Sequence, residues 1–314
     1  MTDIGTVTAR SSTGPGAVPV RRGVVIGLSA LGGFALTVLW SAPFVDKVIG
    51  DGVTSAILGH EAAEAPMTSA LAGIAFAFAS GLGGTFTACN IAALGAVAPL
   101  LGQQRSLRSR FAQTLPPLGW LAAGMAAVSA VYGVVAALFG THLPQYSTAT
   151  ASSGLSPRLV QSMVVFGVIG LILCYLGLAA LKIVKDPLEG VERRFPHIRS
   201  LVMGLLIGAF LIGRPFGLYR QLFRDVADSG NPLYGAFAFV TQSLGNIVVL
   251  AVVFLLLSVA AGGRVQRWIT AKPGRAAVIT ASAFLVAGVF TFLYWDVRLL
   301  ARTGVIWYPT ITWY

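Results

Sequence analysis

Two cysteines are the residues of this chain best suited to covalent chemistry. Cys89 follows a glycine-rich stretch at 80–84 and stands beside Thr87 and Asn90. A cysteine reacts as its thiolate, and polar neighbours together with the free amides of a broken helix can stabilise that anion. Cys174 lies in an unbroken apolar run, where a cysteine alone is a small packing residue. Cys89 is therefore the stronger candidate for a catalytic thiol.

Cys174 becomes a second catalytic candidate because both cysteines are expected at a similar depth in a membrane. A disulfide requires Cα atoms within about 7 Å, and the sequence does not give that distance. If the two thiols meet, Cys174 can resolve a disulfide formed at Cys89 by thiol–disulfide exchange.

Arg214 is the third candidate. A charge in the middle of a membrane helix costs about 2.5–3.5 kcal/mol, so such a residue usually faces a cavity or a partner. The alternative is that Arg214 lies near the outer end of a broken helix and extends to water with Arg220 and Arg224. Both interpretations remain open.

Gln242, Ser243 and Asn246 form a polar stripe that either bonds helix to helix or lines a pathway. His60 and Glu64 stand one helical turn apart and are interpreted as a solvated face. We expect no metal site and no organic cofactor.

The elements that position these residues are membrane helices. The chain has 314 residues, 56% of them hydrophobic and 11% charged, with a mean hydropathy of +0.79. A soluble domain carries about 25% charged residues, so a water-soluble or nucleic-acid-binding domain is excluded. A span needs roughly 20 apolar residues. Seven are predicted, at 24–44, 69–101, 118–139, 159–184, 201–223, 233–261 and 276–297.

Basic residues indicate the orientation. With seven spans, 15 Lys and Arg residues fall on the side of the N-terminus and seven on the other. The positive-inside rule then places the N-terminus in the cytoplasm and the C-terminus outside. The polar arm at 1–22 is expected to be flexible, and the aromatic tail at 298–314 is expected to anchor at the interface.

The second and fifth spans are predicted to break. The first break contains Gly81, Gly83, Gly84 and a later Pro99, and the second contains Gly213 and Pro215. Irregular backbone at membrane depth must pack in protein or line a cavity. After an extra helix at 23–45, the chain divides into triplets at 68–184 and 200–297, each opening with a broken span. Three is an odd number, so the triplets form an inverted repeat. Glycines that only permit close packing are the alternative.

The segment 81–99, with Thr87, Cys89 and Pro99, resembles the first motif of the DsbD/CcdA transmembrane proteins of cytochrome c biogenesis. The segment 208–223 resembles the second motif, and the likeness covers about 68–295. The resemblance implies two inverted three-helix repeats that pass electrons from cytoplasmic thioredoxin to a thioredoxin-like protein outside a bacterial plasma membrane. Ala88 replaces the proline of the family, and Arg214-Pro215 stands where the second cysteine is expected.

The function expected from this resemblance is thiol–disulfide electron transfer through Cys89, with Cys174 as a resolving partner and membrane lipid around the helices. One rival is a solute or ion carrier on the same scaffold, with Arg214 attracting an anion to the half-helix ends. A redox-inactive assembly factor is the other. No nucleic acid partner is expected.

Overall fold

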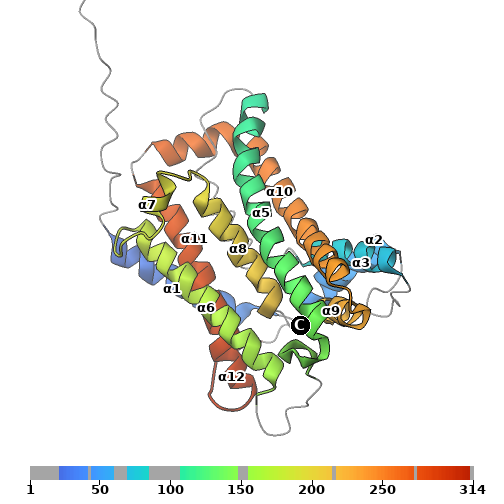
Figure 1. The fold of residues 1–314 in the computed structure, drawn as a ribbon. Coiled ribbons are helices and arrows are strands. Elements are labelled where there is room, and N and C mark those ends of the chain that lie inside the picture. Colours follow the sequence, from blue (N-terminus) through green and yellow to red (C-terminus); the bar gives the residue numbers. More distant parts are fainter. Residues whose placement is uncertain are drawn as a thin grey trace, which may run out of the picture.

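The computed structural model describes residues 21–41, 44–59, 69–84, 107–147, 155–213, 217–271 and 274–311, and every regular element within these ranges is helical. The prediction of an all-helical membrane protein is therefore confirmed at this level. Figure 1 shows the helices as a bundle, with α8 between α5 and α6.

Five helices carry a stretch that is long and apolar enough to cross a membrane. They are α1 (Arg22–Leu39), α5 (Leu107–Phe139), α6 (Pro157–Ala180), α10 (Pro232–Thr270) and α11 (Arg275–Phe292). A sixth span is obtained if α8 (Ile198–Gly213) and α9 (Gly217–Ser229) are taken together, although the two helices are bent by 82° at the break between them.

The remaining elements are shorter. They are a π-helix η1 (Phe44–Asp51), α2 (Gly52–Leu58), α3 (Ala70–Gly83), the 3-10 turns η3 (Gly140–His142) and η4 (Pro144–Tyr146), α7 (Glu189–Glu192), the π-helix η5 (Leu293–Val297) and α12 (Arg298–Arg302). The α3 helix begins the predicted span at 69–101, and the rest of that span lies outside the described residues.

Local sequence sets several of these boundaries. The hydroxyl of Ser69 accepts a hydrogen bond from the Ala72 amide at 3.3 Å, which caps the start of α3. Ser156 caps α6 in the same way through the Leu159 amide, with a proline in the first turn. The α2 helix ends at Gly59, whose φ of 75° favours glycine.

The helices over 44–58 are not predicted by the sequence. Their apolar residues recur at helical spacing, but the run is shorter than the roughly 20 residues of a full span. In the structure this pair packs on α3, because Thr54 donates to the carbonyl oxygens of Gly50 at 2.8 Å and Ala79 at 3.4 Å. The short apolar helices α2 and α3 thus pack against each other beside α10 (Figure 1).

The contacts between helices also give their relative directions. Along α3 and α10, Gly73 meets Tyr234 and Gly81 meets Gln242, so these two helices run parallel. Gly204 of α8 meets Leu121 of α5, and Gly208 meets Met125, so α5 and α8 also run parallel.

Two other helix pairs run antiparallel. Gly133 meets Gly235 and Ser129 meets Ser243 along α5 and α10, and Gly170 meets Gly288 and Gly177 meets Ala281 along α6 and α11. Taken with the parallel pairs, these directions mean that α3 and α8 run in opposite directions.

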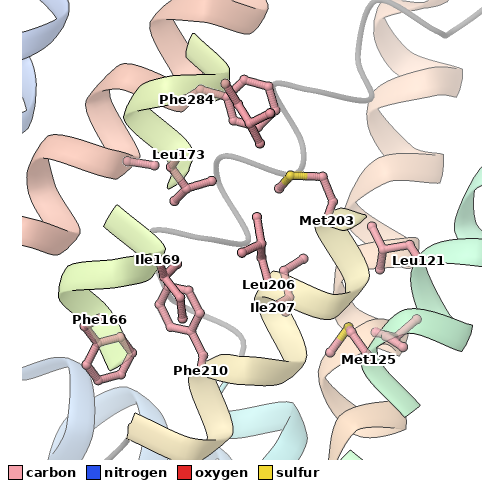
Figure 2. Close-up of a cluster of buried hydrophobic side chains, with 13 residues drawn as sticks. Leu121, Met125, Phe166, Ile169, Leu173, Met203, Leu206, Ile207, Phe210 and Phe284 are labelled. Carbon is pink, nitrogen blue, oxygen red and sulfur yellow. The ribbon is translucent and has the colours of Figure 1, made fainter. Parts of the chain in front are cut away.

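Residues of α5, α6, α8, α10 and α11 form one of the two large core clusters of the described residues. Figure 2 shows Met203, Leu206, Ile207 and Phe210 of α8 between α5 and α6. Leu121 and Met125 face them from α5, and Phe166, Ile169 and Leu173 face them from α6. This packing holds the final turns of α8 in the middle of the bundle.

Candidate functional site

A hydrogen bond between two buried serines joins the midpoints of two spans. Ser129 of α5 and Ser243 of α10 pair through their hydroxyls and are 0% and 3% exposed. Each serine lies near the middle of its apolar stretch, at 115–142 in α5 and 232–253 in α10. Serine pairs of this kind hold membrane helices together, at about 0.6 kcal/mol on average.

A small cavity of about 20 Å³ lies next to this pair. A volume of this size holds about one water molecule. Its wall comes from five helices or helix ends, at Gly84, Met125, Ile207, Gly208, Phe210, Leu211, Tyr219, Gln242, Ser243 and Asn246. Polar groups therefore meet a small, partly open and mostly apolar cavity between these helices.

Close glycine contacts bring the cavity walls together. A Cβ on Gly124 of α5 would collide with the Leu201 carbonyl of α8, and a Cβ on Gly204 would collide with the Leu121 carbonyl of α5. Each glycine thus meets the carbonyl of the residue that lies three positions before the other glycine in the sequence.

The crossing of α3 and α10 has the same geometry. A Cβ on Gly245 would collide with the carbonyl of Phe78, three residues before Gly81, and a Cβ on Gly81 would collide with the carbonyl of Gln242, three residues before Gly245. Only a residue without a side chain permits these distances.

The α3 and α8 helices both end at the cavity. Gly84 follows the last residue of α3, and the Tyr219 hydroxyl lies where a Cβ of Gly84 would be. Phe210 and Leu211 lie in the last turn of α8. The carbonyl ends of helices carry a partial negative charge, so this side of the cavity favours cations and hydrogen-bond donors.

Gln161 of α6 holds the end of α8 in place. Its side-chain amide donates to the Ile212 carbonyl at 2.7 Å and to the Tyr132 hydroxyl at 3.3 Å. Gly213 packs against the ring of Phe166, with no room for a side chain. The interruption predicted around 213–215 coincides with the end of α8 at Gly213 and the start of α9 at Gly217.

The structure brings several predicted site residues together. Gly84, Gln242 and Asn246 line the cavity, and Gly81 lies one turn away at the crossing of α3 with α10. Gly83 packs instead against the Gly50 carbonyl of η1. The polar stripe of α10 therefore faces the interior of the bundle.

Cys174 lies elsewhere, on the side of α6 that faces α11. A Cβ on Gly288 would lie 2.7 Å from both the amide nitrogen and the sulfur of Cys174. Neither α6 nor α11 contributes a residue to the cavity wall. The remaining predicted residues, Thr87, Cys89, Asn90, Pro99, Arg214 and Pro215, lie outside the described residues, as does the pair His60 and Glu64.

Several residues of the site are not predicted from the sequence, among them Ser129, Met125 and Tyr219. Ser129 could have been found from the sequence, because it lies in the middle of a predicted span and serine is a residue type that hydrogen-bonds between membrane helices. Met125 and Tyr219 have no such signal, because apolar and aromatic residues are common in membrane helices. The described residues contain no cluster of three or more His, Cys, Asp or Glu side chains that could hold a metal ion.

No protein-family model matches the chain, and no curated protein or solved structure is significantly similar to it.

Proposed function

We propose that the protein consists of two inverted three-helix repeats, at 68–184 and 200–297, behind the additional helix at 23–45. The opposite directions of α3 and α8, the first helices of the two triplets, support this arrangement. So do the matched crossings, in which the Gly81–Gly245 pair repeats the contacts of the Gly204–Gly124 pair. A two-fold relation exchanges α3 with α8 and α5 with α10.

The cavity then lies on the axis that relates the repeats. Met125 and Asn246 both line the cavity, and each follows a crossing glycine by one residue. Gly84 and Ile207 also line the cavity, and each follows a crossing glycine by three residues. Transport proteins built on inverted repeats carry their sites at the midplane, where broken helices meet.

The activity that we propose is thiol–disulfide electron transfer across a membrane, with Cys89 as the reacting thiol. One observation carries this proposal: α3 leads into the wall of the central cavity, and Cys89 follows Gly84 by five positions in the sequence. The resemblance to the DsbD/CcdA proteins gives the same role to this cysteine. Cytoplasmic thioredoxin and an external thioredoxin-like protein are the proposed partners.

The exchange balances with one cysteine in the membrane. The Cys89 thiolate attacks a disulfide of the external partner, forms a mixed disulfide and expels one thiolate of that partner. A cytoplasmic thiolate then attacks the Cys89 sulfur and releases the second external thiolate. The remaining cytoplasmic thiol attacks the resulting mixed disulfide and frees Cys89. Two electrons pass from the cytoplasmic dithiol to the external disulfide.

An intramolecular disulfide between Cys89 and Cys174 is the alternative route, and it makes Cys174 the resolving thiol. Reduction of an external disulfide protein by thioredoxin enclosed in proteoliposomes tests both routes. We expect Cys89→Ser to lower the rate at least tenfold. Cys174→Ser leaves the rate unchanged in the one-cysteine route. In the two-cysteine route it lowers the rate as much as Cys89→Ser does. A Cys89→Ser protein with the wild-type rate would contradict electron transfer.

A second candidate function is carriage of a cation or a small hydrogen-bonding solute. The observation that favours it is the polar wall formed by Gln242, Ser243 and Asn246 beside the carbonyl ends of α3 and α8. Solute flux that is lost in Asn246→Leu but retained in Cys89→Ser would support this function over electron transfer.

A further inference from the structure

Three arginines gather where α6 begins and α9 follows the break. Arg158 is in the first turn of α6, and Arg220 and Arg224 are one turn apart on α9. Both α6 and α9 pack against η4, which brings the start of α6 close to α9. The charges of Arg158 and Arg224 both act on the guanidinium of Arg220. Two elements that are far apart in the sequence therefore bring three positive charges near one another.

Acidic side chains do not neutralise this cluster. None of the three arginines forms an ion pair with a carboxylate of the described residues. Asp225 accepts a hydrogen bond from the Tyr234 hydroxyl instead, and Asp228, one turn beyond Arg224, is more than an ion-pair distance away. Arg199, by contrast, forms ion pairs with Asp186 and Glu192.

One nitrogen of the cluster is buried without a hydrogen bond to the described residues. The Nε of Arg158 is buried and has no hydrogen-bond partner among the described residues. A guanidinium without its hydrogen bonds loses solvation that only an opposite charge or an acceptor restores. The planar fork of arginine fits the oxygens of phosphate and carboxylate groups better than other cationic side chains do.

The start of α6 supports a ligand near the membrane surface. Arg158 is the second residue of the apolar stretch at 157–180, so it lies at an end of that stretch, where lipid head groups are expected. Leu218, Leu222 and Val226 of α9 are buried against the bundle, whereas Arg220 and Arg224 of the same helix are more exposed.

From this geometry we infer that Arg158, Arg220 and Arg224 form a binding site for a phosphate-type oxyanion at the end of the bundle where α6 begins. The ligand is a phosphate group, carried either by an anionic lipid or by a soluble molecule. The site is separate from the central cavity, since none of the three arginines lines the cavity wall.

The test compares two sources of phosphate on the purified full-length chain. Thermal unfolding in detergent is measured against inorganic phosphate in one arm. In the other arm, short-chain phosphatidylglycerol is compared with phosphatidylcholine. We expect Arg224→Gln to weaken binding of the stabilising anion at least tenfold. The double variant Arg220→Gln/Arg224→Gln should abolish the stabilisation. Arg193→Gln, a change of an exposed arginine on another connection, is the matched control and keeps wild-type binding.

The outcomes separate the sources. Stabilisation by phosphatidylglycerol alone identifies a lipid head group, and stabilisation by inorganic phosphate alone identifies a soluble ligand. An Arg224→Gln protein that responds as the wild type does, or a wild type that responds to neither probe, would overturn the site. Arg224 is exposed and makes no described hydrogen bond, so the single variant is expected to fold.

Discussion

At the scale of single residues, the site depends on glycines that allow backbones to touch. Gly81, Gly124, Gly204 and Gly245 each face a carbonyl of the neighbouring helix with no room for a side chain. The glycine-rich stretch at 80–84 is recognisable in the sequence, but Gly124, Gly204 and Gly245 look like any other glycine of a membrane helix. Their partners are far away in the sequence, so only the packing identifies them.

Alanine substitutions at these glycines test the packing. We expect Gly81→Ala and Gly204→Ala to destabilise the protein to similar extents, by about 1–3 kcal/mol each, because a methyl group would collide with backbone that has no freedom to move. The free energy of unfolding in mild detergent is the measurement. Gly27→Ala on α1, where nothing lies within 4 Å, is the control and is expected to be neutral or slightly stabilising. Equal stability of Gly27→Ala and Gly81→Ala would count against the proposed crossings.

Gln161 allows a second test of a single side chain. Replacing it with leucine removes the hydrogen bond to the Ile212 carbonyl and leaves that oxygen without this donor at the end of α8. We expect a loss of about 1–3 kcal/mol, measured by unfolding in detergent. Gln161→Glu, which keeps the size but places an acceptor against the carbonyl, should be at least as harmful, and a stable glutamate variant would argue against this hydrogen bond.

At the scale of the elements, sequence and structure agree best where a helix is long and evenly apolar. The predicted spans at 118–139, 159–184, 233–261 and 276–297 correspond to α5, α6, α10 and α11. The pair η1 and α2 was missed because each helix is shorter than a span, and its stability comes from packing on α3. The 82° angle between α8 and α9 was also not predictable, since a break in the periodic pattern carries no angle.

An arginine of α12 holds the carbonyl end of α1, which also packs along α11. Arg298 is 6% exposed and donates from one nitrogen to the carbonyl oxygens of Thr37 at 2.6 Å and Trp40 at 2.8 Å. A cation at the carbonyl end of a helix is favourable because the helix dipole is negative there. Earlier along α1, a Cβ on Gly32 would lie 3.6 Å from the side chain of Val286.

Removal of this cation should loosen α1. In a protein without its native cysteines, a disulfide between Gly32→Cys and Val286→Cys should form readily. Adding Arg298→Met should slow its formation several-fold, because charge-assisted hydrogen bonds of about 1.5–3 kcal/mol are lost. Arg302→Met, on the same short helix α12, is the control and should have little effect. Unchanged cross-linking in Arg298→Met would mean that the apolar contacts of α1 suffice.

At the scale of the whole molecule, the account rests on two triplets of helices that cross the membrane in opposite senses. Composition alone indicates a membrane protein, and the basic residues indicate which face is cytoplasmic. The relation between the triplets is not readable from sequence similarity. Our proposal that the triplets are inverted is supported by the directions of α3 and α8 and by the repeated glycine contacts, both of which are properties of packing.

Single-cysteine accessibility measures this inversion most directly. Ser69 precedes α3 and Arg194 precedes α8, so the two positions mark the same end of each repeat. In sealed, right-side-out vesicles of a protein lacking Cys89 and Cys174, an impermeant maleimide should label Ser69→Cys. It should label Arg194→Cys only after the vesicles are opened. Labelling of both positions from the same side would contradict the inverted repeat, and with it the site that we place between the two halves.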